Sequence, residues 1–560
     1  MNRNYYRLGV GAVMALLFAV TITAQTRSNK DAINRGLDLF TAVFKEMQTF
    51  YVDSIDAEKA VETAINSMLA QLDPYTVYMP RQEVDEFKTM NTGEFGGIGS
   101  YIVQRNGNVY ISGPHQGTPA QRAGMRPGDL IVAIDGDTVL GKTSQEVSDM
   151  LKGTPGTKLE VMVKRPYVKD SLLIFNLTRE KIKMPSVPYF GVERGDLGYI
   201  QLSSFTESTG DEVKIALTEL KKNPAVKTIV LDLRGNPGGL LESAVKVVGN
   251  FVPKGTEVIR TKGKDALTEK VYKTTTAPVD TEIPLILLID GESASAAEIT
   301  AGALQDLDRA VIVGNRSFGK GLVQITRSLP YDGLLKVTVA KYYIPSGRLI
   351  QAIDYSHRDE LGRVTRIPDS LTTEFRTAHG RIVRDGGGIT PDVTVEYPEM
   401  SRIVYNIIRD MWAFDFANKY FAEHPEKPSL DTFKITDSIY EDFKNFIDPD
   451  KFNYDRVCET MLERLKETAK IEGYASDSLD VQFKVLEGML KHPLQQDLDA
   501  QRETIEPIIL REIIERYYYE PGSIIVELRS DRALEKAAET AHTPGKIKEL
   551  LEPKKTAAKK

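Results

Sequence analysis

Two short segments of the sequence carry side chains that could perform serine-based hydrolysis. Residues 290–299 read DGESASAAEI and contain Ser295, and residues 314–324 read GNRSFGKGLVQ and contain Lys320. A neutral lysine can take the proton of a serine hydroxyl, but burial or nearby positive charge must first lower its pKa from about 10.4 toward neutrality. Together the segments predict a Ser–Lys nucleophile and base, and Gln324, four residues on, is placed to orient the amine.

Each segment has a simpler explanation when it is taken alone. Ser295 and Glu298 fit the capping box at the start of a helix, and Lys320 fits a solvated surface charge. Residues 314–320 also match the phosphate-loop pattern GxxxxGK, which is the signature of a nucleotide-binding ATPase. Gly321, however, stands where a Ser or Thr should reach magnesium, and the residues that follow it favour a strand rather than a phosphate-binding helix. We therefore disfavour the nucleotide interpretation.

A third segment, DLRGNPGG at residues 232–239, supplies glycines at the end of a predicted strand. Their backbone N–H groups could point at a carbonyl oxygen and form half of an oxyanion hole, with the N–H of Ala296 as the other half. A simple glycine-rich turn explains the segment equally well.

Composition narrows the chemistry further. The chain has 560 residues, a formal net charge of −7 and 41% apolar residues, which excludes collagen and a wholly disordered chain. The acidic balance gives no reason to expect nucleic-acid binding. The single cysteine, Cys458, cannot form an internal disulfide or a cysteine-based zinc site, and none of the six histidines lies in a catalytic or HExxH pattern. We expect no metal and no cofactor.

The elements that must position these segments follow from hydrophobic patterning. Apolar strands at 228–233, 284–289 and 310–313 alternate with helices at 211–221, 240–251 and 296–307. Near-continuous apolar strands between helices predict a sheet covered on both faces, with the site beyond the carboxyl ends of the strands.

A β-rich module precedes this region. Residues 93–99 read GEFGGIG and enter an alternating stretch, and residues 118–136 read TPAQRAGMRPGDLIVAIDG. The second run closely resembles the signature of bacterial PDZ domains, which bind peptide C-termini by strand addition and carboxylate capture. The resemblance makes Gly97, Ile98 and Gly99 the candidate peptide-binding residues.

The two ends of the chain complete the organisation. Arg3 and Arg7 precede an apolar run at 8–22, which predicts a secretory signal over residues 1–24 and leaves an uncleaved anchor as the alternative. Residues 25–91 are predicted as a helical region. The chain after residue 398 reads as charged helices, and residues 553–560 form a Lys/Ala tail.

The three segments and the PDZ run, in this order, resemble the carboxyl-terminal processing proteases, a family of Ser–Lys endopeptidases. The resemblance extends from about residue 40 to residue 393. It implies Ser295 as nucleophile, Lys320 as base, Gln324 as the residue that orients the lysine, and Ala296 with Gly238 as the oxyanion hole, Gly239 being the alternative to Gly238. Ala297 departs from the family, which often has a further serine there.

The resemblance also implies a multidomain α/β fold. It comprises a PDZ domain at 92–180, a protease core of the crotonase-like type at 181–398 and a C-terminal helical extension at 399–560. The expected function is cleavage of proteins that have accessible C-termini, in the periplasm or cell envelope. A non-catalytic PDZ scaffold is the rival, and membrane proximity, a homo-oligomer and an adaptor are left open.

Overall fold

The computed structural model describes residues 30–553, apart from 170, 266–267, 360–362, 453–456 and 491–492. The predicted signal peptide lies outside the described residues. The chain divides into two compact units. Among the described residues, one unit comprises 30–79 together with 326–337, and the other comprises 80–325 together with 338–553.

The first unit contains two helices and a short strand pair. Residues 30–50 are helical, and α2 (Ala57–Leu69) follows. The sequence predicts that this second helix runs to residue 72, but it ends three residues earlier, because the Asp73 carboxylate accepts backbone N–H groups and holds the next turn. β1 (Val77–Met79) then pairs antiparallel with the start of β18 (Leu334–Tyr343).

The predicted β-rich module opens the second unit. Its sheet has the order β3-β4-β5-β7-β8, with β6 paired to β5. β3 (Ser100–Arg105) is the terminal strand, so one of its edges has no partner among the described strands. The other elements are α3 (Arg81–Thr92), β2 (Glu94–Gly97), β4 (Asn108–Pro114), α4 (Pro119–Arg122), β5 (Leu130–Ile134), β6 (Asp137–Thr138), α5 (Ser144–Leu151), β7 (Lys158–Lys164), β8 (Leu172–Thr178) and β9 (Glu180–Lys183).

The alternating region forms a six-stranded sheet in the order β10-β11-β12-β15-β16-β21. The sheet is parallel from β11 onward, and β10 pairs antiparallel at one edge. Every residue of the three central strands is buried, which requires cover on both faces. The strands are β10 (Tyr189–Glu193), β11 (Leu197–Gln201), β12 (Thr228–Asp232), β15 (Leu285–Ile289), β16 (Val311–Gly314) and β21 (Val393–Thr394).

The helices predicted between these strands cover the first face. They are α6 (Thr209–Lys221), α7 (Leu241–Val248) and α8 (Ala296–Asp306). They share one apolar core with sheet residues such as Leu231 and Leu287. The first face of the sheet is therefore covered by helices that lie between its strands in the sequence, as predicted.

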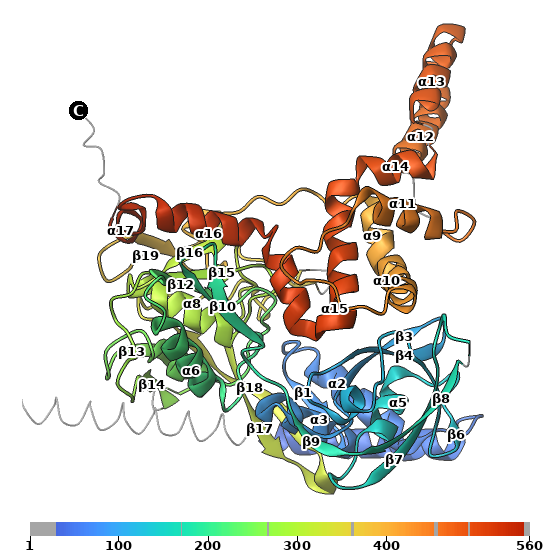
Figure 1. Ribbon diagram of the computed structural model, residues 1–560. Coiled ribbons are helices and arrows are strands. Elements are labelled where there is room, and N and C mark those ends of the chain that lie inside the picture. The colour runs from blue at the N-terminus through green and yellow to red at the C-terminus, as the bar shows by residue number, and fades with distance from the viewer. Residues whose placement is uncertain are drawn as a thin grey trace, which may run out of the picture. The chain divides into compact units, whose positions relative to one another are not determined.

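The second face is covered by the end of the chain. Val230 and Ile286 pack in one cluster with Leu534, which belongs to α16 (Arg532–His542). α16 and the following α17 (Lys546–Leu551), at the red end of the colour scale, lie over this sheet in Figure 1. Sequence patterning predicted two covered faces but left the role of the late helices open.

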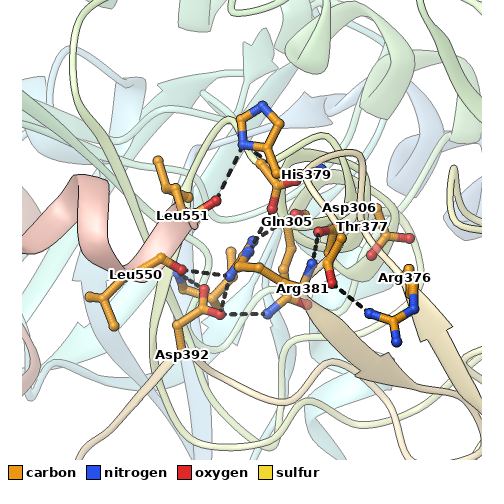
Figure 2. Close-up of polar contacts among 12 residues, drawn as sticks. Gln305, Asp306, Arg376, Thr377, His379, Arg381, Asp392, Leu550 and Leu551 are labelled. Atoms are coloured by element: carbon orange, nitrogen blue, oxygen red, sulfur yellow. Dashed lines mark hydrogen bonds and ion pairs between the residues drawn. The ribbon is translucent and has the colours of Figure 1, made fainter. Parts of the chain in front are cut away.

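A cluster of polar side chains holds the end of α17 against the core, as Figure 2 shows. Arg381 donates to the carboxylate of Asp392 at 2.6 Å and to the carbonyl oxygens of Gln305 and Leu550 at 2.9 and 3.1 Å. His379 Nδ1 lies 3.3 Å from the carbonyl oxygen of Leu551. The Leu550 carbonyl at the end of α17 thus meets the buried Arg381, and the Leu551 carbonyl meets the exposed His379.

The remaining elements belong to the second unit, except that β17 ends within the first. Within the described part of the chain, no helix is both long enough and apolar enough to span a bilayer. The strands are β13 (Glu257–Gly263), β14 (Lys270–Lys273), β17 (Leu322–Ser328), β19 (Glu374–Arg376) and β20 (Ile382–Arg384), and the helices are α9 (Arg402–Arg409), α10 (Trp412–Glu423), α11 (Asp437–Phe446), α12 (Val457–Ile471), α13 (Asp477–Leu490), α14 (Leu494–Ala500) and α15 (Arg502–Leu528).

Candidate active site

Two loops meet beyond the carboxyl ends of the neighbouring parallel strands β12 and β15. The Ala294 N–H donates to the carbonyl oxygen of Asn236 at 3.0 Å, and the Gly235 N–H donates to the Asp290 carboxylate at 3.1 Å. These hydrogen bonds hold the DLRGNPGG segment against the segment that contains Ser295. The location is the one expected for a site in a parallel sheet.

Ser295 lies at the sharp turn between β15 and α8. Its φ of 55° and ψ of −113° fall in a region that non-glycine residues rarely adopt, at a cost of about 1–3 kcal/mol. Ala296 is the first residue of α8, so its N–H has no acceptor within the helix. A serine on a strained strand–turn–helix junction, beside a free helix N–H, has the arrangement of a nucleophile.

The neighbouring Ser293 has a different environment. It is fully buried, and its hydroxyl oxygen lies 2.8 Å from the carbonyl oxygen of Leu233 and accepts the Asp290 N–H at 3.0 Å. These contacts brace the two loops against each other. Ser293 is therefore a structural residue, and Ser295 is the candidate nucleophile.

Glu298 connects the serine turn to the lysine loop. Its Oε2 accepts the backbone N–H of Ser295 at 2.9 Å and the backbone N–H of Lys320 at 2.8 Å. Its Oε1 accepts the Gly319 N–H at 2.7 Å and the Ser317 hydroxyl at 2.5 Å. The capping-box pattern pointed to the contact with Ser295, but nothing in the local spacing pointed to the lysine loop. One carboxylate oxygen thus fixes the backbones of both candidate catalytic residues.

Lys320 is half-buried in the loop between β16 and β17. The hydroxyl of Tyr342 is hydrogen-bonded to the carbonyl oxygen of Lys320 and lies 3.3 Å from that of Ser295. The chain continues as the strand β17 and not as a helix, so the phosphate-loop alternative lacks the helix it requires. Gln324 donates its amide to the Thr338 hydroxyl at 3.2 Å, and its orienting role stays a prediction.

One of the predicted oxyanion-hole donors, the Gly238 N–H, is already hydrogen-bonded within its own loop. A Cβ placed on Gly238 would lie 2.7 Å from the Ser295 Cβ and 2.9 Å from the Ala296 nitrogen, so only glycine fits there. The Gly238 N–H, however, donates to Asn236 Oδ1 at 2.9 Å. Its role as a donor to substrate would require that bond to open, and Gly239, the alternative, becomes the better candidate. The Asn–x–Gly spacing, typical of side-chain-capped turns, was the signal that sequence reasoning missed.

The candidate peptide-binding loop joins β2 to β3. Ile98 is buried, and its carbonyl oxygen accepts the Ala120 N–H at 2.9 Å. The carbonyl oxygen of Gly99 accepts the Thr118 hydroxyl at 2.8 Å. Gly97 is the last residue of β2. The carbonyl oxygens of Ile98 and Gly99 are therefore hydrogen-bonded within the β-rich module. Capture of a terminal carboxylate by the N–H groups of this loop stays a prediction.

Glu298→Gln should destabilise the protein, because all four hydrogen bonds of this side chain come from donors, and an amide would place two N–H groups among them where even the neutral acid places only one O–H. We expect a loss of about 2–4 kcal/mol at pH 5. Burial raises the pKa of the Glu298 carboxyl to about 7, against the opposing effect of its four hydrogen bonds. The stability contributed by this raised pKa is complete below about pH 4.5 and is lost as the pH rises through about 7.

Urea unfolding of both proteins at pH 5 and pH 8 measures this effect. The stability difference between the wild-type protein and the glutamine variant should shrink toward pH 8. Curves that stay parallel across this range would contradict the assignment.

Four stretches of the chain match models of known protein families. Residues 196–356 match the model of "Peptidase family S41", and residues 110–165 match a PDZ domain model. Residues 403–541 match "Probable PDZ-protease, C-terminal helical domain", and residues 16–83 match "Activating protease CtpB N-terminal domain". The fold and site therefore define a serine peptidase that carries a PDZ domain.

Two curated relatives show the family. The carboxy-terminal-processing protease of Bartonella bacilliformis is 36% identical over 401 residues, which cover 71% of this chain and 84% of that protein. The "Probable CtpA-like serine protease" of Staphylococcus aureus strain COL is 30% identical over 466 residues, 83% of each chain. The solved photosystem II D1 C-terminal processing protease is 28% identical, with a TM-score of 0.35, over 64% of this chain and 92% of its own. The chain belongs to the carboxy-terminal-processing proteases of peptidase family S41.

Proposed function

We propose that this protein is an exported endopeptidase that binds the C-terminal tails of proteins through its PDZ domain and cleaves them with a Ser295–Lys320 dyad. The observation that carries the proposal is the shared Glu298 Oε2, which accepts the backbone N–H groups of both residues. This carboxylate ties the two loops together and so holds the backbones that carry the hydroxyl and the amine next to each other. Such prior ordering is what a proton-transfer pair requires.

The proposed reaction is transfer of the substrate acyl group to Ser295, followed by hydrolysis of the acyl-enzyme. Neutral Lys320 takes the proton of the Ser295 hydroxyl while the oxygen attacks the peptide carbonyl. The N–H of Ala296 and one N–H of the Gly238–Gly239 pair stabilise the oxyanion. Lys320 then gives its proton to the leaving amine. Water, deprotonated by the same amine, hydrolyses the acyl-enzyme and restores the serine.

The PDZ domain would present the substrate. The free edge of β3 is the surface on which an extended peptide can add as a strand. The loop of Gly97, Ile98 and Gly99 precedes that edge and would hold the terminal carboxylate on its amides. Tethering the tail raises the local concentration of the adjoining chain at the active site.

Three further features belong to the proposal. Residues 1–24 would direct export to the periplasm or cell envelope. The α/β core would be of the crotonase-like type. A homo-oligomer or an adaptor would be compatible with the chain, as would a position near a membrane.

A model protein with an apolar C-terminal tail tests the proposal. The purified enzyme is incubated with two versions of this substrate, one with a free C-terminal carboxylate and one with a C-terminal amide. We expect the fragment masses to show cleavage of the first version and at least about tenfold slower cleavage of the second, because one charge-assisted contact is lost. The Ser295→Ala protein, which lacks the proposed nucleophile, is the negative control. No cleavage of either version would refute the peptidase function, and equal cleavage of both would refute tail recognition.

A further inference from the structure

Arg234, in the DLRGNPGG loop, lies between two carboxylates from distant parts of the chain. Its Nε lies 3.0 Å from both carboxylate oxygens of Asp232, the last residue of β12. Its two terminal nitrogens donate to Asp531 at 3.1 and 2.6 Å. The side chains of Arg234 and Asp531 are only 19% and 13% exposed. A bidentate, largely buried pair of this kind fixes the geometry of both partners.

Asp531 belongs to the C-terminal helical region. It follows α15 and is the N-cap of α16, where its carboxylate also accepts the Leu534 N–H at 2.8 Å. The same helix covers the second face of the central sheet through Leu534 and Ala537. Asp531 is therefore held firmly at the point where the helical region meets the catalytic core.

The arginine in turn anchors the loop that carries the oxyanion glycines. Arg234 is followed by Gly235, whose N–H binds Asp290, and by Asn236, whose carbonyl oxygen binds the Ala294 N–H. Gly238 then lies directly against Ser295. Without the Asp531 contact, Arg234 would be held by Asp232 alone, which would loosen the start of this loop and let the glycine amides shift relative to the serine.

We propose that Asp531 is a positioning residue of the peptidase, which holds Arg234 and thereby sets the oxyanion loop. The C-terminal helical region thus contributes to the active site through a side chain and not only by packing. The inference rests on the proposed function, because it assigns a role within the same reaction.

The test compares Asp531→Asn with Glu535→Gln in the full-length protein. Asparagine is as good an N-cap as aspartate, so α16 keeps its start, while the negative charge that faces the Arg234 guanidinium is lost. Glu535 lies one turn later on α16 and pairs with Arg194 of the core at 3.1 Å. Glu535→Gln therefore weakens a different contact between α16 and the core. Because this contact does not involve the DLRGNPGG loop, the variant is the matched control.

We expect Asp531→Asn to lower kcat by about 100-fold, as small misplacements of catalytic groups do, with KM and tail affinity nearly unchanged. A peptide aldehyde, which forms a tetrahedral adduct on the serine, should lose affinity in parallel. Glu535→Gln should behave as the wild-type protein. Wild-type kcat in Asp531→Asn, or equal losses in both variants, would overturn the inference.

A readout independent of activity accompanies these measurements. Hydrogen exchange of the 234–239 segment should accelerate in Asp531→Asn and not in Glu535→Gln. If exchange stays at the wild-type rate, the inference fails whatever the peptidase result. If the wild-type enzyme cleaves nothing while exchange accelerates as expected, the proposed function fails and the anchoring of the loop stands.

Discussion

Ser295→Ala should reduce kcat for peptide hydrolysis by about 10⁴-fold or more, the size of effect that loss of a catalytic nucleophile has elsewhere. The oxyanion donors and the PDZ domain stay in place, so the affinity for a C-terminal tail should be unchanged. Single-turnover kinetics and tail binding, measured on the same preparations, separate the two quantities.

Ser293→Ala is the matched control, two residues away. It removes a buried hydroxyl that lies 2.8 Å from the Leu233 carbonyl oxygen, which should cost about 1–3 kcal/mol of stability. Its kcat should stay close to that of the wild-type enzyme. Loss of activity in a folded Ser293→Ala protein, together with an active Ser295→Ala protein, would move the nucleophile to Ser293.

Ser295→Gly adds a second measurement that does not depend on activity. Glycine adopts the positive φ of this position without strain. The variant should be inactive yet more stable than Ser295→Ala, by about 1 kcal/mol. Equal stability of the two variants would show that the turn stores no strain.

Lys320→Ala should lower kcat by about 10³-fold or more, because no other group would accept the serine proton. Lys320→Arg should be equally inactive, because a guanidinium keeps its positive charge but has no proton-free form near neutral pH. The pair of variants therefore distinguishes a base from a simple positive charge. Small primary amines added to Lys320→Ala should restore part of the rate.

Arg316→Ala supplies the control for the same loop. Arg316 forms an exposed ion pair with Asp369 at 2.8 Å, and such pairs contribute little to stability. Its kcat should change by less than about threefold. An active Lys320→Arg enzyme would exclude lysine as the general base.

Local sequence patterns predicted the parts of the site that depend on neighbouring residues. The buried strands, the helix from residue 296 and the strand after Lys320 all follow from hydrophobic period and turn residues, and the structure has each within a few residues. The capping box likewise pointed to the contact between Glu298 and the Ser295 N–H. These features are encoded within single segments of the chain.

The features that were not predicted depend on contacts between distant segments. The link from Glu298 to the Gly319 and Lys320 amides joins two loops, and the link from Arg234 to Asp531 spans 297 positions. The sequence predicted charged helices after residue 398, but a single sequence does not specify which surface such helices will cover. The hydrogen bond from Gly238 to Asn236 was local, and turn chemistry could have revealed it.

The cover of the second face of the central sheet affects the order in which the protein can fold. Val230, Ile286 and Leu288 lose their contact with water only when the helix that carries Leu534 arrives. One face of this sheet therefore stays exposed in a growing polypeptide until α16 has been synthesised, and Asp531 can reach Arg234 only from then on.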